Sequence, residues 1–389
     1  MMHIFKKILC VLSLLSIVFL VPSDAYANDG SIILETASLE HDVRQGQYNS
    51  LVQVDSDTYA LAYAGVDNHG HISTFTISSD GSSVVEVDTL EHDTVQGLHN
   101  SLVQVDSDTY ALAYAGAVDN GFISTFTIDS NGNIAAVKTQ SLGNNLEHDT
   151  VQGLHNSLVQ VDSDTYALAY AGAVDNGFIS TFTIDSDTGA ITPILIQNHA
   201  VKGGSANLEH DETKGLHNSL VQVDSDTYAL AYEGLDRDGY ISTFTIDSNG
   251  NIAAVKTESE GNNLEHDTNR GSFNSLVHVV SDTYALAYTS HGEDGFISTF
   301  TISSSGVITP IQIQNHANTS EEDDVANLEH DEDRASFNSL VHVVSDTYAL
   351  AYTSHGEDGF ISTFTISSSG VITPILIQNH AVKGGSANL

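Results

Sequence analysis

Short runs of β-branched, aromatic and small apolar residues alternate with polar turns along most of the chain. Runs of this kind, bounded by Asp, Asn, Ser and Gly, predict β-strands joined by tight turns. In the first copy of the pattern the predicted strands cover residues 49–54, 58–64, 71–77 and 84–93. No segment shows convincing helical periodicity. The sequence therefore predicts an all-β protein.

The second predicted strand is apolar on both of its faces. Tyr59, Leu61 and Tyr63 share one face, and the three alanines that alternate with them share the other. Both faces should therefore be covered, and one of them is bulky and the other small. This pattern suits sheets that pack face to face as wedges.

The whole pattern is repeated along the chain. The tetrapeptide Leu-Glu-His-Asp begins at residues 39, 90, 146, 208, 264 and 328. Repeats of about fifty residues with four short strands are typical of β-propeller blades. We expect a β-propeller of about six four-stranded blades, with a linear array of β-sheet repeats as the alternative.

The two ends of the repeat region bear on how the ring closes. Residues 31–42 are an extra copy of the fourth-strand block and are available to complete a blade from the N-terminal side. Residues 372–389 repeat residues 191–208, so Leu389 falls inside a further copy of the signature. A six-bladed ring is the simplest interpretation, and six blades of a larger ring in a longer parent protein are the alternative.

One stretch of the repeat carries a resemblance to known proteins. His-Asn-Ser-Leu-Val-Gln-Val-Asp-Ser-Asp-Thr-Tyr-Ala-Leu-Ala-Tyr at 99–114, followed by Gly-Phe-Ile-Ser-Thr-Phe-Thr-Ile at 121–128, resembles the repeat of secreted, acidic, propeller-like proteins of marine microbes, archaeal ones included. The resemblance covers nearly all of residues 31–389. It implies a propeller-like fold and an envelope or extracellular location, and it implies no activity.

The first residues have the features of an export signal. Lys6 and Lys7 precede an apolar run over 8–21, which ends before the small-x-small motif at 25–27. The run is short for a membrane span. We expect residues 1–27 to be a signal peptide and residues 28–389 to be an exported repeat domain, secreted or at the cell surface. The single cysteine, Cys10, excludes a disulfide framework.

The charge balance narrows the possible partners. The chain has 11 Lys and Arg against 51 Asp and Glu, a net charge of -40. Nucleic acids and anionic membrane surfaces attract basic proteins, so neither is an expected partner. An acidic surface would keep an exported repeat protein soluble in salty water.

The repeated Glu-His-Asp triplet is the first candidate for chemistry. On an extended strand its two carboxylates share one face and the imidazole takes the other, so one copy chelates a metal poorly. We expect the histidine or aspartate to bond a neighbouring turn, near Asn49, Ser50 or Asp57, and to tie blades together. The predicted structural network comprises His41, Asp42, His92, Asp93, His148, Asp149, His210, Asp211, His266, Asp267, His330 and Asp331.

Planar side chains recur at two other places in each repeat. One position precedes the repeated Asn-Ser-Leu-Val, and the other precedes Ile-Ser-Thr-Phe. Such rings either stack on sugars or pack between blades; the absence of Trp weakens the sugar interpretation. The candidate ligand-binding residues are His99, His155, His217, Phe122, Phe178 and Tyr240.

Metal binding has little support in the sequence. The acidic turn at 55–57 lacks the twelve-residue pattern of a calcium loop, and the fifth and sixth copies carry Val280 and Val344 at its first position. A turn is the favoured interpretation, with weak Ca²⁺ binding from charge density alone as the alternative. No cofactor is predicted.

The repetition also bears on activity. Common catalytic motifs do not occur, and every polar candidate comes in similar copies, whereas an active site needs a singular arrangement. We therefore predict a non-enzymatic scaffold that binds carbohydrate or another envelope component by many weak contacts. The alternatives are a polysaccharide hydrolase or lyase, and a purely structural surface or adhesion protein.

Overall fold

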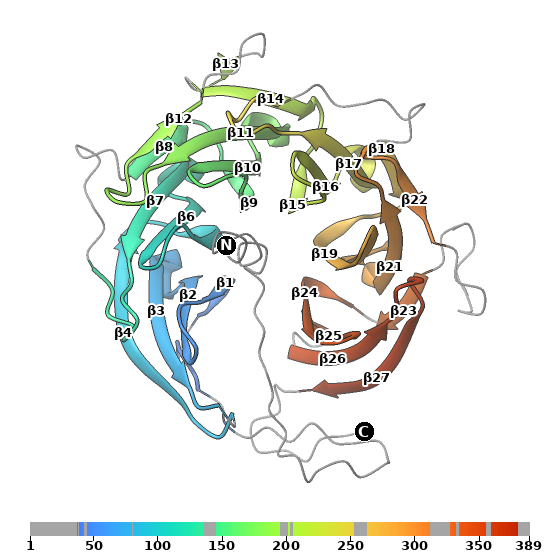
Figure 1. Ribbon diagram of the computed structural model, residues 1–389, viewed down its shortest axis with the longest axis horizontal. Helices are drawn as coiled ribbons and strands as arrows, with labels where there is room; N and C mark the ends of the chain where they lie inside the picture. Colours follow the sequence, from blue (N-terminus) through green and yellow to red (C-terminus); the bar gives the residue numbers. More distant parts are fainter. Residues whose placement is uncertain are drawn as a thin grey trace, which may run out of the picture.

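The computed structural model describes residues 37, 39–42, 45–79, 81–135, 145–194, 201–202, 205–252, 263–311, 327–331, 334–354 and 359–379. Six antiparallel sheets stand around a central axis as a six-bladed β-propeller (Figure 1). The predicted all-β propeller is confirmed, and the linear array is wrong. The predicted signal peptide at 1–27, the segment 31–36 and the end of the chain at 380–389 lie outside the described residues.

In each blade the first strand lies innermost, and in blade 3 the short strand β13 lies outside the last strand, β14 (Figure 1). Blade 1 contains β1 (Gln47–Gln53), β2 (Thr58–Ala64), β3 (Gly70–Ile77) and β4 (Val84–Asp93). Blade 2 contains β5 (Leu98–Gln104), β6 (Thr109–Ala115), β7 (Gly121–Thr127) and β8 (Asn145–Asp149). Blade 3 contains β9 (Leu154–Gln160), β10 (Thr165–Ala171), β11 (Gly177–Ile184), β12 (Ile191–Pro193), β13 (Val201–Lys202) and β14 (Ser205–Asp211).

The second half of the ring repeats this plan. Blade 4 contains β15 (Leu216–Gln222), β16 (Thr227–Glu233), β17 (Gly239–Thr245) and β18 (Asn263–Asp267). Blade 5 contains β19 (Ser272–Val280), β20 (Thr283–Thr289), β21 (Gly295–Ile302), β22 (Ile308–Pro310) and β23 (Asn327–Asp331). Blade 6 contains β24 (Ser336–Val344), β25 (Thr347–Thr353), β26 (Gly359–Ile366) and β27 (Ile372–Asn379).

Short 3-10 turns connect the second and third strands of five blades. They are η1 (Val66–Asn68), η2 (Ala117–Asp119), η4 (Ala173–Asp175), η5 (Leu235–Arg237) and η7 (His291–Glu293). No helix in the described part of the chain is long and apolar enough to cross a membrane.

The two-faced second strand forms the contact between blades, as predicted. Ala111 and Ala113 of blade 2 are fully buried and belong to the same apolar cluster as Tyr166, Leu168 and Tyr170 of blade 3. Four further clusters join the other successive blades in the same way. The small face of each blade thus receives the bulky face of the next.

The predicted strand limits agree closely with the observed ones, except at the first strand. β1 begins at Gln47 and contains a register shift between Gln47 and Ser50. Tyr48 in this bulge has a φ of 54°. Because a bulge inserts an extra residue, the alternation of polar and apolar positions does not predict the start of this strand.

Residues 31–42, of which the structure describes 37 and 39–42, were predicted to be available to complete one blade of the ring. The outer edge of β26 is instead paired with β27 along its whole length, from Phe360 opposite Asn379 to Ile366 opposite Ile372. The last blade therefore takes its fourth strand from its own repeat, because the hydrogen-bonding edge available to the N-terminal copy is already occupied.

Glycine at the start of the third strand is required by the histidine of the signature. In blade 2 a Cβ on Gly121 would overlap the imidazole of His148. We expect Gly121→Ala to lower the free energy of unfolding by about 1–3 kcal/mol, the usual effect of overpacking. Urea unfolding measures it, and the double variant Gly121→Ala, His148→Ala should remove the overlap. An unchanged unfolding free energy for the single variant would contradict the described packing.

Candidate functional site

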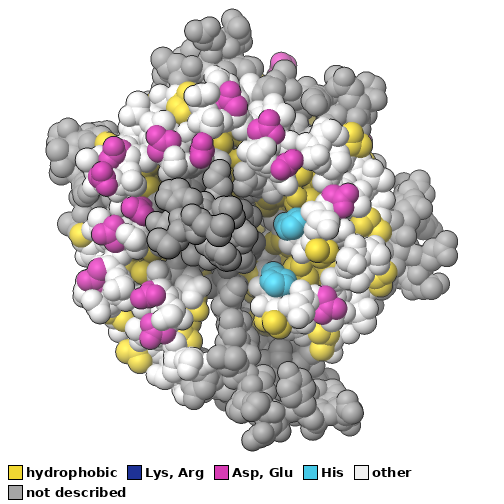
Figure 2. Space-filling model, in the orientation of Figure 1, with side chains coloured by type: hydrophobic (Ala, Val, Ile, Leu, Met, Phe, Trp, Pro, Cys, Tyr) yellow, Lys and Arg dark blue, Asp and Glu magenta, His cyan; other side chains and the backbone are white. Residues whose placement is uncertain are grey.

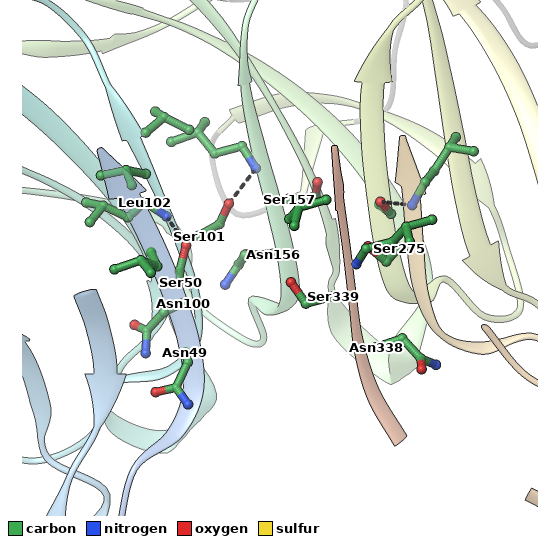
Figure 3. Close-up of a pocket in the computed structure, with 18 of the residues that line it drawn as sticks. Asn49, Ser50, Asn100, Ser101, Leu102, Asn156, Ser157, Ser275, Asn338 and Ser339 are labelled. Carbon is green, nitrogen blue, oxygen red and sulfur yellow. Dashed lines mark hydrogen bonds between the residues drawn. The ribbon is translucent and has the colours of Figure 1, made fainter. Parts of the chain in front are cut away.

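The innermost strands line a central cavity of about 1760 Å³ (Figure 3). At one level of this cavity each blade contributes a planar side chain from a residue with φ between 52° and 57°. Neighbouring rings lie with centroids 4.3–4.7 Å apart. The ring-bearing residues are Tyr48, His99, His155, His217, Phe273 and Phe337. We call this set the channel rings.

Polar side chains next to the channel rings connect successive blades. The Asn100 amide donates to the backbone oxygens of Tyr48 and Gly97, and the Leu102 N–H donates to Ser50 Oγ at 2.9 Å (Figure 3). The same bonds recur at the next four interfaces. These hydrogen bonds tie the innermost strands of successive blades together along the cavity wall.

The three channel histidines are neutral at physiological pH. Burial lowers the pKa of His99 to about 3 and that of His217 to about 4, where Glu233 partly offsets the effect of burial. Burial, together with the nearby His217 and His99, also places the pKa of His155 well below its usual value. A neutral imidazole offers one hydrogen-bond donor and one acceptor to a ligand.

The other three candidate ligand-binding residues lie elsewhere. Phe122, Phe178 and Tyr240 each stack on a tyrosine of their own blade, with ring centroids 5.5–5.7 Å apart. Phe178 is only 1% exposed and belongs to the apolar core between blades 2 and 3. None of the three is among the residues that line the central cavity. The two sets of planar side chains are therefore in different environments.

The aspartates of the predicted structural network hold turns and reach the next blade. Asp149 Oδ1 accepts the backbone N–H groups of Val151 and Gln152, and its Oδ2 accepts the hydroxyl of Tyr170. In the N-terminal copy Asp42 Oδ1 accepts the N–H of Gln45. These partners differ from the expected ones near Asn49, Ser50 and Asp57, because the turn that follows the signature folds back over the carboxylate.

The histidines of the predicted structural network contact an aromatic ring of the next blade. The ring of His92 meets Tyr114 of the next blade edge-on, with centroids 4.7 Å apart, and the other copies repeat this contact. Both ring nitrogens are buried without a hydrogen-bond partner in His92, His210, His266 and His330. Burial lowers the pKa values in this set to between about 3 and about 4.

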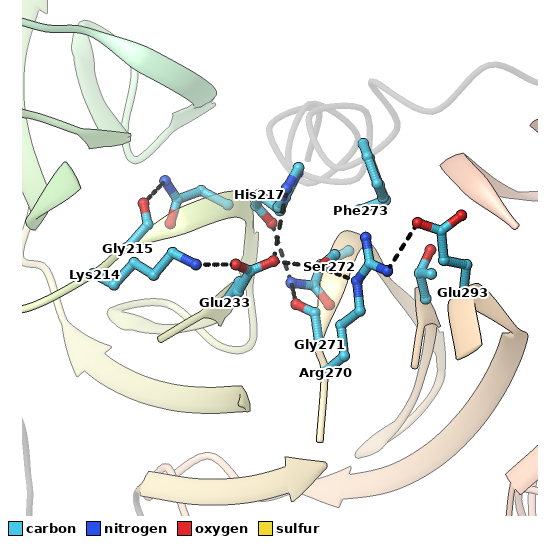
Figure 4. Close-up of polar contacts among 12 residues, drawn as sticks. Lys214, Gly215, His217, Glu233, Arg270, Gly271, Ser272, Phe273 and Glu293 are labelled. Atoms are coloured by element: carbon cyan, nitrogen blue, oxygen red, sulfur yellow. Dashed lines mark hydrogen bonds and ion pairs between the residues drawn. The ribbon is translucent and has the colours of Figure 1, made fainter. Parts of the chain in front are cut away.

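One position breaks the symmetry of the ring. Blade 4 ends its second strand with Glu233, where the other blades carry Ala or Thr. The carboxylate is almost completely buried. It pairs with Lys214, accepts the hydroxyl of Ser272 from blade 5, and lies 3.8 Å from His217 Nε2 (Figure 4).

The environment keeps this buried carboxylate ionised. Burial by itself would raise the pKa of Glu233, but the hydrogen bonds from Lys214 and Ser272 outweigh it, so the pKa lies below its ordinary value. His217 is therefore the one channel ring that faces a buried negative charge.

Basic side chains follow the signature in blades 4 to 6, and one of them, Lys214, pairs with Glu233. Lys214, Arg270 and Arg334 occupy one repeat position, which is Gln in blades 1–3, and they are three of the five Lys and Arg residues in the described part of the chain. Arg270 and Arg334 both lie 3.4 Å from Glu293. Acidic side chains are instead spread around the face seen in Figure 2. We call Lys214, His217, Glu233, Arg270 and Ser272 the blade 4/5 cluster.

The sequence analysis did not identify this cluster because it considered the residues that the repeats have in common. The signal was nevertheless present as two departures from the repeat: Ala to Glu at residue 233, and Gln to Lys or Arg at residues 214 and 270. Their proximity depends on the register that places Leu216 opposite Glu233, and on the packing of blade 5 against blade 4.

The described residues contain no group of three or more His, Cys, Asp or Glu side chains arranged to hold a metal ion. In the acidic turn of blade 1, Asp55 Oδ1 accepts the N–H of Ser56, a local turn contact. Weak calcium binding remains a prediction of the sequence.

No known protein family and no curated protein matches this chain. Solved structures do resemble it. A periplasmic gluconolactonase of Pseudomonas aeruginosa has a TM-score of 0.57 at 12% identity, covering 85% of this chain and 84% of that one. A candidate 6-phosphogluconolactonase from Bacteroides fragilis has a TM-score of 0.56 at 12% identity, covering 84% and 82%. An Aleuria aurantia lectin, solved with Fucα1-6GlcNAc, reaches 0.49 at 9% identity, covering 87% and 97%.

At these identities the likeness shows the propeller fold alone. It nevertheless corrects one prediction. We predicted a protein that is not an enzyme, because its polar groups come in similar copies; that prediction is wrong, since the similar propellers include gluconolactonase-type hydrolases. The assumption that every polar group recurs in each repeat also fails within this chain, because the blade 4/5 cluster has no counterpart in blades 1–3.

Proposed function

We propose that the protein is an exported propeller that binds a sugar lactone, or a related cyclic sugar ester, in its central cavity and hydrolyses it beside blade 4. The observation that carries the proposal is the buried carboxylate of Glu233, placed 3.8 Å from the Nε2 atom of a cavity-lining histidine. Export rests on the sequence of residues 1–27.

The blade 4/5 cluster has the parts that ester hydrolysis needs. A neutral imidazole at His217 accepts a proton from water as the oxygen of that water attacks the ester carbonyl. The ring C–O bond then breaks, the proton passes to the leaving alkoxide, and a hydroxy acid results. Glu233 is a positioning residue that stabilises the transient imidazolium, and the neighbouring cations favour the negative charge that develops on the carbonyl oxygen.

The cavity wall suits a ligand rich in hydroxyl groups. Asn, Ser and Gln side chains line it at equivalent places in several blades, next to the channel rings. Planar rings give a sugar a stacking surface, and the amide and hydroxyl groups give it hydrogen bonds. The gluconolactonase-type activity named for similar folds fits this ligand class.

The placement of the candidate residues favours one site over many. His99, His155 and His217 face one shared cavity, while Phe122, Phe178 and Tyr240 pack within and between blades. We therefore propose carbohydrate as the partner class, bound once per ring rather than through repeated sites on its rim.

The test uses δ-gluconolactone as the probe and follows acid release with a pH indicator. We expect catalysed hydrolysis above the buffer rate by the wild type, and a loss of about a hundredfold or more in His217→Ala, the usual range for removal of a general base. The matched control is His155→Ala, which removes the same side chain from the equivalent position in a blade without the carboxylate. The His155 ring also lines the cavity and packs against His217, so this variant should retain most of kcat while KM rises.

Glu233→Ala restores the residue found in blades 1–3 and should lower kcat more than it changes KM, since Glu233 acts through His217. Two results would overturn the proposal: no rate above buffer in the wild type with this lactone, or equal losses in His155→Ala and His217→Ala.

A further inference from the structure

The contacts between successive blades are repeated five times and have no sixth copy among the described residues. Leu102 bonds Ser50 across the first interface, and the corresponding bond recurs up to Leu340 with Ser275. No such bond joins Leu51 to Ser339, although both residues are described. The channel rings likewise meet in five pairs, and no pair joins Phe337 to Tyr48.

The two end blades are correspondingly less covered than the others. Ala351 on the small face of blade 6 is exposed, whereas its equivalents in blades 1 to 5 are fully buried. Leu61 on the bulky face of blade 1 is half-buried, whereas its equivalents in the other blades are fully buried. Phe337 is 55% exposed. Figure 1 shows these blades as the two separated ends of the ring.

The two faces are the halves of the interface that the protein already uses five times. On the small face of blade 6 Ala351 is exposed and Ala349 is half-buried, and on the bulky face of blade 1 Leu61 is half-buried between the buried Tyr59 and Tyr63. If five equal steps leave the ends apart, each step turns through less than one sixth of a circle. A ring that keeps this step closes with more than six blades, and propellers of up to about eight blades are common.

We propose that the gap between blade 6 and blade 1 is a docking site for one further four-stranded blade of this same repeat. Its bulky face would cover Ala351, and its small face would cover Leu61. The segments outside the described residues are each shorter than one repeat, the longest being 1–36, so the blade is an additional repeat unit. A whole second copy does not fit, because its following blades would overlap blade 1.

The test measures the access of a thiol reagent to the small face of blade 6. In a Cys10→Ser background, which removes the only cysteine, Ala351→Cys should react quickly with a maleimide under native conditions. Ala287→Cys, at the equivalent and fully buried position in blade 5, should react at least a hundredfold more slowly. Slow reaction of both thiols would mean that six blades close by themselves, and would overturn the proposal.

The second arm adds the missing blade. A chain with residues 328–388 duplicated in tandem should protect Ala351→Cys to the level of Ala287→Cys and should melt at a higher temperature. The matched control carries Asp in place of the added copy's equivalent of Leu350, which lies on the bulky face, and should leave the thiol reactive. Continued rapid reaction in the seven-repeat chain, or protection that depends on protein concentration in the six-repeat chain, would overturn the proposal.

Discussion

Lowering the pH from 7 to 5 is expected to unfold the protein. The ring nitrogens of the Leu-Glu-His-Asp histidines are buried in five copies, with pKa values of about 3 to about 4 in the folded state. In the unfolded chain they titrate near 6.5. Below this value the unfolded state binds more protons than the folded state, so stability falls as the pH falls.

The expected size of the effect is large because the histidines act together. Each loses about 1.4 kcal/mol of stability per pH unit below the unfolded pKa, and five of them lose about 10 kcal/mol by pH 5. The whole stability of a typical domain is about 5–15 kcal/mol. Stability is therefore fully present above about pH 7 and is lost between pH 6.5 and pH 4.

Circular dichroism during thermal unfolding at a series of pH values measures this loss. His210→Gln should reduce the slope of stability against pH by about 1.4 kcal/mol per unit, because one titrating group is removed. His278→Gln changes an exposed histidine and should leave the slope as it was. A protein that keeps its melting temperature down to pH 4.5 would show that these imidazoles are not buried and neutral.

Truncating the central leucine of a second strand is expected to be the most damaging single core substitution. Leu168 is fully buried between blades 2 and 3. Leu168→Ala should lower the free energy of unfolding by about 2–5 kcal/mol, because it loses apolar burial and leaves a cavity. Leu61→Ala makes the same change at the equivalent, half-buried position of blade 1 and should cost clearly less.

Urea unfolding of the two variants compares identical chemistry in two environments. The difference in unfolding free energy reports how well the bulky face of blade 1 is covered in solution. Equal losses would mean that this face is as buried as the inner ones, which contradicts the described end of the ring.

The sequence predicted most of the fold because the fold is made of local, repeated elements. The limits of β2 and β4 agree exactly with the predicted strands over 58–64 and 84–93. The alternation of Tyr and Leu with Ala also predicted that each blade would be covered on both faces. These features depend on strand geometry and on the side chains within one repeat.

The candidate site was only partly predictable. His99, His155 and His217 were named as candidates, but nothing in the sequence distinguished their shared cavity from the packed positions of Phe122 and Phe178. Both sets recur once per repeat and look alike in a sequence. A bulge and a positive φ turn the first set toward the axis, and such backbone features leave no periodic signal.

By itself the sequence determined the strands, the order of the sheets and the complementary faces of the blades, because short-range alternation specifies them. Only the tertiary structure decided which side chains meet across blades, as Glu233 meets Ser272, and which remain partly exposed at the two end blades, as Leu61 and Ala351 do. These contacts join residues of different strands and blades. They depend on the register of each sheet and on the angle between blades, neither of which one repeat encodes alone.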